Sequence, residues 1–207
     1  MKIYLLDINK DMTDAWHKYF DSYIEVENIE IMNEDFATFM DEHPNIEAIV
    51  SPANSFGLMD GGYDKAITDY FGKELMEDVK KVIMEKWFGE QPVGTSLTVP
   101  IKNRVISDKK HGLFAKKYSV LIHTPSMRTP EQIIDSRIIY QCMRTTLIEA
   151  MKQEVDNIVI PAFGGLTGKV PYEDIAKMMY LAYKQIYNQP KELNWGYALH
   201  IAKELKR

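Results

Sequence analysis

The sequence predicts an α/β fold in which a mixed, mostly parallel sheet lies between helices on both of its faces. The first observation is an alternation along the chain: short apolar runs of strand type are followed by segments whose apolar residues recur every three or four positions. Such an alternation is typical of a largely parallel sheet covered by helices. The second observation is the composition, because 207 residues with 45% hydrophobic and 27% charged residues are typical of a globular chain with one domain.

The first half of the chain carries three predicted strands and four predicted helices. The strands are short runs of β-branched and other apolar residues, or alternate apolar with acidic residues, and cover residues 2–8, 23–32 and 46–50. The helices have apolar residues at helical spacing and cover residues 12–20, 35–41, 63–71 and 73–88. Asn9 or Asp11 is expected to cap the first helix, since short polar side chains accept hydrogen bonds from the first free N–H groups.

The second half continues this pattern. Four further strands are predicted at residues 95–99, 104–106, 117–123 and 157–160. Three helices are predicted at residues 133–154, 172–188 and 195–205. Glu173 and Asp174 lie in the first turn of the second of these helices, where the helix dipole favours acidic side chains.

Charge is spread unevenly, although the net charge is only −5. Residues 1–50 contain 3 basic and 12 acidic residues, whereas residues 101–130 contain 7 basic residues and one acidic residue. A basic segment can contact phosphate groups. Without interleaved aromatic residues, however, this one is more typical of a solvent-exposed hairpin, so we do not expect nucleic acid as a partner.

Other features set the expected environment. No apolar run approaches the ~18 residues of a membrane span, and the N-terminus lacks the pattern of a signal peptide. Cys142 is the only cysteine and is expected in the core, so a cytoplasmic protein is predicted. No group of Cys, His, Asp and Glu has the spacing of a metal site, and we expect neither a metal nor another cofactor. The sequence does not indicate a protein partner.

Two glycine-rich loops each follow a predicted buried strand and precede a predicted helix. They read SPANSFGLMDGG at residues 51–62 and PAFGGLTGKVP at residues 161–171. Glycine lets a backbone approach a ligand closely, and free N–H groups at a helix start attract phosphate. In a parallel sheet, ligands lie beyond the carboxyl ends of the strands, so the two loops are placed to hold a diphosphate between them. The alternative is that the glycines only form tight turns.

The two loops resemble those of macro domains. SPANSFGLMDGGYDKAI is similar to the signature of this family, an Ala-Asn followed by a glycine run that opens a helix, and IVIPAFGGLTGKVP is similar to its phosphate loop. NEDF at residues 33–36 stands in the place of the family's Gly-Asp-Ile. The resemblance implies a three-layer α/β/α fold that spans residues 1–207, with 190–207 as a C-terminal helical extension. It also implies binding of ADP-ribose or a related NAD-derived nucleotide. Some macro domains hydrolyse ADP-ribosyl bonds or ADP-ribose 1″-phosphate.

The resemblance also implies which residues contact the ligand. Asp35 would accept a hydrogen bond from the adenine amino group, Asn54 would contact the distal ribose, and Phe163 would pack near the adenosine. The other ligand-binding positions come from the same three motifs: Phe36, Ala53, Gly61, Gly62, Tyr63, Pro161, Gly164, Gly165, Leu166, Thr167 and Gly168. Structural alternatives stay open, since Asp35 is also a suitable helix N-cap, Asn54 a turn residue and Phe163 a core residue.

Four residues are candidates for catalysis: Asn54, which would hold the ribose, Asp60, Asp64 and His123. Asp64 follows Asn54 by ten residues, and this spacing resembles that of MacroD-type ADP-ribosyl hydrolases. The resemblance implies that the carboxylate of Asp64 activates a water. The alternative is that Asp64 only stabilises the start of its helix. Asp60 replaces a glycine that is common in the family, and because a carboxylate repels a diphosphate it is either turned away or functional. His123 is a further candidate base, or a hydrogen-bonded structural histidine. A hydrolase and a non-catalytic ADP-ribose-binding module therefore both remain possible functions.

Overall fold

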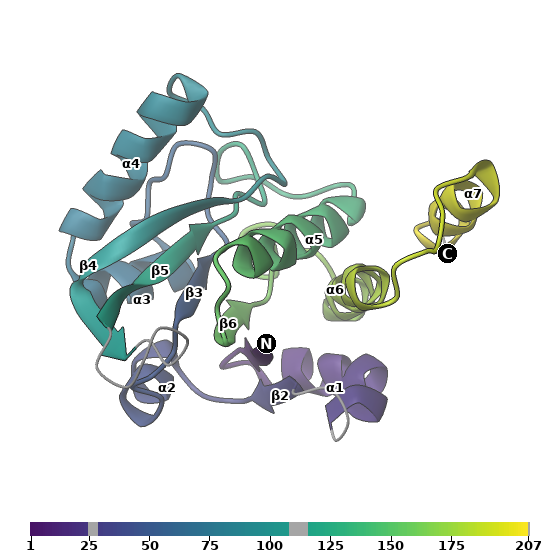
Figure 1. Cartoon of the computed structure of the whole chain (residues 1–207), viewed down its shortest axis with the longest axis horizontal. Helices are drawn as coiled ribbons and strands as arrows, with labels where there is room; N and C mark the ends of the chain where they lie inside the picture. Colours follow the sequence, from purple (N-terminus) through teal and green to yellow (C-terminus); the bar gives the residue numbers. More distant parts are fainter. Residues whose placement is uncertain (25–28, 108–115, 207) are drawn as a thin grey trace.

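A computed structural model of the protein describes residues 1–24, 29–107 and 116–206. Within these residues, six strands form the middle layer in the order β2-β1-β6-β3-β5-β4 (Figure 1). Their bounds are β1 Lys2–Leu6, β2 Ile29–Met32, β3 Ala48–Ser51, β4 Leu97–Ser107, β5 Lys116–His123 and β6 Asn157–Pro161. β4 runs antiparallel to β5, and the other neighbours are parallel. The predicted mixed, mostly parallel sheet is therefore confirmed.

Both faces of the sheet are buried, and the alternation of side chains along each strand divides the core into two layers. Ile3 and Leu5 of β1 belong to one layer, whereas Tyr4 and Leu6 belong to the other. This follows from the period of two in a strand, and it explains why the central strands read as continuous apolar runs.

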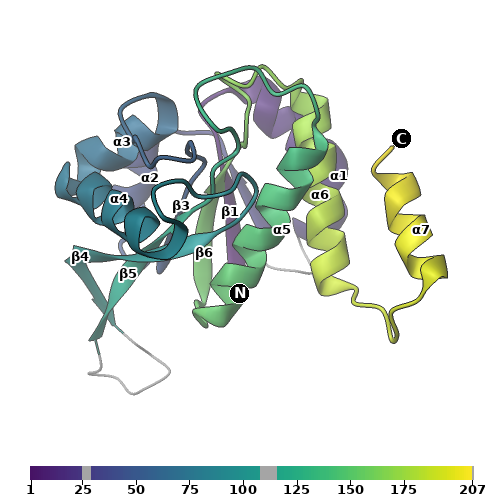
Figure 2. The ribbon, with the colours of Figure 1, turned by 90° about the horizontal axis from the view of Figure 1, so that it is seen from above.

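Helices cover each core layer, as the view in Figure 2 shows. One face carries α1 Lys10–Ile24, α5 Arg137–Lys152 and α6 Tyr172–Tyr187. The opposite face carries α2 Phe36–Glu42, α3 Gly62–Phe71 and α4 Glu74–Trp87. α7, Trp195–Glu204, lies beyond α6 and has no buried residue. The three-layer α/β/α prediction is confirmed, and no helix of the described residues has the length and apolar content to cross a membrane.

Three predicted boundaries were wrong. The strand predicted over residues 23–32 is shorter, because α1 continues to Ile24 and β2 begins only at Ile29. The strands predicted at 95–99 and 104–106 are one strand, β4, whose register against β5 shifts between Ile101 and Val105. The helix predicted from residue 133 begins only at Arg137. Ile133 lies instead against the second glycine-rich loop, where its N–H donates to the carbonyl oxygen of Gly168 at 2.9 Å.

Three basic residues of the 101–130 segment, Lys102, Arg104 and Lys117, have partners within the chain. Lys102 pairs with Asp78 at 2.6 Å and Lys117 with Glu47 at 2.7 Å. Arg104 donates to the carbonyl oxygens of His43 and Pro44 at the end of α2. Lys109 and Lys110 lie outside the described residues. The expectation about nucleic acid stays a prediction.

Candidate ligand-binding cleft

The first glycine-rich loop connects the carboxyl end of β3 to α3, and the side chain of Asn54 holds its shape. Asn54 Oδ1 accepts hydrogen bonds from the N–H groups of Phe56 at 3.1 Å and Leu58 at 3.3 Å, and Nδ2 donates to the carbonyl oxygen of Leu58 at 2.8 Å. This is the turn-forming use of asparagine. Nδ2 carries two hydrogens, so one N–H remains for a ligand.

At the end of this loop, α3 begins with free backbone donors. Gly61 is its N-cap and offers no side-chain hydrogen bond to the first turn. The N–H groups of a first helical turn have no partner within the helix, and together with the helix dipole they attract anions. A Cβ added to Gly61 would meet no atom within 4 Å, so the space beside this residue is open.

The second glycine-rich loop connects β6, the neighbour of β3, to α6. Gly164 has φ of +73°, a conformation that favours glycine, and a Cβ there would lie 2.6 Å from Ile133 Cδ1. A Cβ on Gly168 would lie 2.6 Å from the carbonyl oxygen of Gly164. These two glycines are therefore required by the packing of the loop itself.

A cleft of about 250 Å³ lies between the two loops. The predicted residues that line it are Ala53, Asn54, Asp60, Gly61, Gly62, Tyr63, Asp64, Gly164, Gly165, Leu166 and Thr167. The side chain of Leu166, which is 77% exposed, reaches across to the first loop, where its Cδ2 lies 3.5 Å from the position of a Cβ on Gly62. Leu166 thus narrows the opening between the loops.

A third segment, which follows β5, completes the wall of the cleft through Ser126, Met127 and Pro130. The N–H of Ser55 donates to the carbonyl oxygens of Met127 and Arg128, at 3.2 and 3.1 Å, and so fastens this segment to the first loop. Sequence reasoning missed Met127 and Pro130 of this segment, and three lining residues that flank the predicted ones: Pro52, Leu58 and Ala162. The sequence feature that could have indicated the third segment is its position directly after a predicted strand. Only the strand order shows that this strand, β5, is adjacent to β3.

Asp64 is a buried carboxyl group that lines the cleft. Its side chain is largely buried, with 8% exposure, and Oδ1 accepts a hydrogen bond from Ser51 Oγ at 2.7 Å. Burial raises the pKa of Asp64 to about 7, the hydrogen bond from Ser51 lowers it, and the charge of Asp60 raises it further. Ser51 reaches Asp64 because it is the last residue of β3 and faces α3. A carboxyl group with a pKa near neutrality can take up and release a proton at physiological pH.

Asp60 contrasts with Asp64, since it is exposed at the cleft and has no hydrogen-bond or ion-pair partner among the described residues. Two basic residues adjoin the lining in sequence, and both are engaged elsewhere. Lys65 pairs with Asp69, and Arg128 pairs with Glu90 at 2.7 Å. Of the described residues that line the cleft, none is lysine, arginine or histidine.

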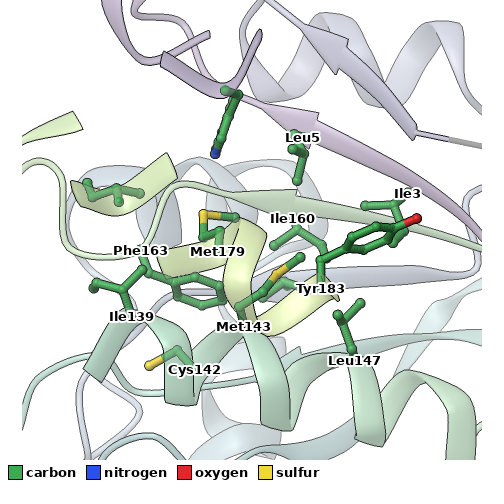
Figure 3. Packing of buried hydrophobic residues seen from close by; sticks show 14 of the residues in the cluster. Ile3, Leu5, Ile139, Cys142, Met143, Leu147, Ile160, Phe163, Met179 and Tyr183 are labelled. Carbon is green, nitrogen blue, oxygen red and sulfur yellow. The ribbon is translucent and has the colours of Figure 1, made fainter. Parts of the chain in front are cut away.

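Several predicted site residues lie outside this cleft. His123 is fully buried, its Nδ1 lies 2.7 Å from Oε1 of Gln91, and burial lowers its pKa to about 3. A histidine that is neutral and enclosed in this way fits the structural alternative. Phe163 is also fully buried, beside Ile139 and Met143 in the core (Figure 3), which fits the core alternative.

Asp35 caps α2. Its Oδ1 accepts from the N–H groups of Ala37 at 3.0 Å and Thr38 at 3.1 Å, and its Oδ2 accepts from Thr38 Oγ1 at 2.6 Å. These bonds, above all the one from the Thr38 hydroxyl, lower the pKa of Asp35. Three more predicted residues do not line the cleft: Phe36, which packs edge-on against the ring of Tyr63, Pro161 and Gly168.

Comparison with known proteins identifies the family. The sequence profile of the family described as Macro domain matches residues 50–179, more than half of the chain. The chain belongs to the macro domain family.

The fold of this macro domain is similar to those of solved macrodomains. The Oceanobacillus iheyensis macrodomain with ADP is 18% identical, with a TM-score of 0.56 over 78% of this chain and 83% of that chain. The macrodomain of Mycobacterium tuberculosis DarG is 16% identical, with a TM-score of 0.53 over 69% of this chain and 84% of that chain. An uncharacterized protein of Aquifex aeolicus is 29% identical over 134 residues, which are 64% of this chain and 70% of that protein.

Three solved variants of the Oceanobacillus iheyensis macrodomain also have this fold, with a TM-score of 0.55 each. They replace an asparagine by alanine, a glycine by valine and an aspartate by alanine, and the glycine variant is described with ADPR. Their identities to this macro domain are 19%, 17% and 19%, over 71%, 78% and 78% of this chain and 70%, 85% and 85% of those chains.

Proposed function

We propose that this macro domain binds ADP-ribose or a closely related nucleotide in the cleft and hydrolyses the bond between C1″ of the distal ribose and a substituent. The observation that carries the proposal is the state of Asp64: a carboxyl group held by Ser51 at 2.7 Å, with a pKa near 7, in a cleft between two glycine-rich loops. Perturbed carboxyl groups in clefts are typical of catalytic sites.

The backbone supplies the binding of the diphosphate. The free N–H groups at the start of α3 and the glycines of both loops can approach phosphate oxygens without a side chain in between. The remaining N–H of Asn54 would contact a ribose hydroxyl. Asp35 is exposed and, among the described residues, its Oδ2 accepts one hydrogen bond, so it can still accept one from the adenine amino group.

The solved variants support the choice of Asn54, Gly61 and Asp64 as site residues. In the Oceanobacillus iheyensis macrodomain, the replaced asparagine, glycine and aspartate follow one another at intervals of seven and three residues. Asn54, Gly61 and Asp64 follow one another at the same intervals. These are the residues that line the cleft beside the start of α3.

In the proposed reaction, ionised Asp64 accepts a proton from a water while the oxygen of that water bonds to C1″. The bond from C1″ to the substituent breaks, its electron pair leaves with the substituent, and the leaving group takes up the proton. Ser51 acts as a positioning residue, because its hydroxyl fixes Oδ1 and leaves Oδ2 for the water.

A non-catalytic ADP-ribose-binding module is the second candidate. It is favoured by Asn54, whose amide makes three hydrogen bonds to its own loop. Calorimetry with ADP-ribose tests binding, and product release from ADP-ribose 1″-phosphate and from ADP-ribosylated proteins tests hydrolysis. We expect binding and turnover of a 1″-linked substrate. Binding without turnover of any of these substrates would exclude the hydrolase and support the non-catalytic binding module. Absence of binding at millimolar ligand would exclude both functions.

A further inference from the structure

The cleft combines a backbone suited to an anion with a carboxylate that repels one. Asp60 is exposed to the cleft, and the described residues that line it include no lysine, arginine or histidine to neutralise it. Arg128, one residue beyond Met127 of the lining, does not do so. Its Nε and Nη2 hold the two carboxylate oxygens of Glu90 at 2.7 and 3.0 Å, and its guanidinium lies 5.3 Å from the ring centre of Phe56.

Asp60 and Asp64 line the same end of the cleft. Asp60 immediately precedes Gly61, the N-cap of α3, and Asp64 lies in the first turn of that helix, so both carboxyl groups border the cleft at the start of α3. If Asp64 serves C1″, as in the proposed function, Asp60 faces the substituent at C1″. A carboxylate there weakens the binding of an anionic or neutral substituent relative to a cationic one.

We propose that this macro domain selects ADP-ribose derivatives whose C1″ substituent is a cation, with Asp60 as the residue that determines this specificity. The inference rests on the proposed function. The substituent that fits best is the guanidinium of ADP-ribosylated arginine, because a planar guanidinium can donate two parallel hydrogen bonds to a carboxylate. A 1″-phosphate would place a second anion against Asp60 and is the disfavoured substrate.

The reaction balances for such a substrate. The oxygen of water bonds to C1″, the C1″–N bond breaks, and its electron pair stays on the guanidine nitrogen. This nitrogen takes up the proton that Asp64 received from the water. The products are ADP-ribose and the unmodified arginine side chain, still protonated.

The test compares two peptides of one sequence, one ADP-ribosylated on arginine and one on serine. To prevent hydrolysis, affinities are measured by calorimetry in the Asp64→Asn protein, alone and combined with Asp60→Asn or Asp60→Gly. The matched control is the double variant that combines Asp64→Asn with Asp69→Asn. Asp69 is also a residue of α3, but it pairs with Lys65 and does not line the cleft. ADP-ribose binding to the wild type is measured first, by the same method.

We expect the arginine-linked peptide to bind about tenfold or more tightly than the serine-linked one, the effect of one charge-assisted hydrogen bond. This preference disappears with either Asp60 variant and persists in the Asp69 control, while the affinity for ADP-ribose itself rises when Asp60 is replaced. Equal affinities for the two peptides, or a preference that survives both Asp60 variants, overturn the inference while the proposed function stands. Failure of the wild type to bind ADP-ribose overturns the proposed function as well.

Discussion

The two glycine-rich loops look alike in sequence, but glycine serves different purposes at different positions in them. In the first loop, Gly61 borders open space at the start of α3. In the second loop, Gly164 has a positive φ and packs against Ile133, and Gly168 closely approaches the backbone of Gly164. Gly61 leaves room for a ligand, whereas Gly164 and Gly168 let their loop fold. Gly57 of the first loop is of the second kind, because its φ is +67° and a Cβ there would lie 2.8 Å from Val79 Cγ1. A run of glycines beside a strand therefore has no single meaning until the surroundings of each residue are known.

The polar side chains that line the cleft are also distributed unequally between the two loops. The first loop and the helix that it enters carry the polar side chains of the cleft, Asn54, Asp60 and Asp64, whereas the second loop contributes backbone, Leu166 and Thr167. Substitutions in the first loop should therefore change turnover and binding, and substitutions in the second should change stability.

The largest effect is expected from Asp64→Asn. Removal of a general base lowers turnover about 10²–10⁴-fold, while the affinity for ADP-ribose is retained because the isosteric amide still accepts the hydrogen bond from Ser51. Steady-state kinetics with a 1″-linked substrate and calorimetry measure the two quantities, with Asp69→Asn as the control. An unchanged kcat would mean that Asp64 is not the general base and only stabilises the start of its helix.

Stability gives a second measurement on the same variant. Burial raises the pKa of Asp64 in the folded protein to about 7. At pH values between the ordinary pKa of aspartate and 7, the folded protein therefore keeps a proton on this group, whereas the unfolded chain has released it. Stability from this group is therefore lost as the pH rises through this range. Asp64→Asn should be more stable than the wild type at pH 8, by on the order of a few kcal/mol, and the difference should shrink toward pH 4. Chemical denaturation at several pH values measures it, and a pH-independent difference would argue against the raised pKa.

Next in size is the contrast between Gly164→Ala and Gly61→Ala. Alanine at position 164 meets both an unfavourable φ and Ile133 at 2.6 Å, which should cost about 1–3 kcal/mol of unfolding free energy. Alanine at position 61 meets nothing within 4 Å and should change stability by less than about 0.5 kcal/mol. Equal losses in the two variants, measured by urea denaturation, would break the distinction between the loops.

A bulkier replacement sharpens the same contrast. Gly61→Trp should fill the open space at the start of α3 and weaken ADP-ribose binding about tenfold or more, a loss of about 1.4 kcal/mol, without lowering Tm. Calorimetry and thermal melting test the two parts. Retained affinity would show that the ligand does not approach this part of the first loop.

The smallest effect is expected from Ser51→Ala. The hydroxyl of Ser51 favours the ionised form of Asp64, so its removal should raise the pKa of Asp64 and move the acidic limb of the pH–rate profile upward by about one unit. Ser51→Thr, which keeps the hydroxyl, is the control and should leave the limb in place. A profile that does not move in Ser51→Ala would mean that Asp64 is not the group that titrates in the reaction.

Most of the fold could be predicted from the sequence, because strand and helix periodicity are local properties. The runs around Ile3, Ile49 and Ile158 are continuous apolar segments, and both loops of the cleft follow directly from them. One error occurred at a residue that a distant segment holds. Ile133 has the apolar spacing of the following helix, yet it lies against the second glycine-rich loop, where its N–H is bonded to Gly168.

The sequence by itself determined the order of the elements, the two loops and the residues that those loops could offer, because these depend on local spacing and residue type. Only the tertiary structure decided which of them meet. The order β6-β3-β5 puts both loops and the segment of Ser126 at one edge of the sheet. The same packing encloses His123 away from the cleft and sets Ser51 against Asp64. Burial and charge, and hence the pKa of a carboxyl group, depend on neighbours that are remote in sequence, and no local pattern contains them.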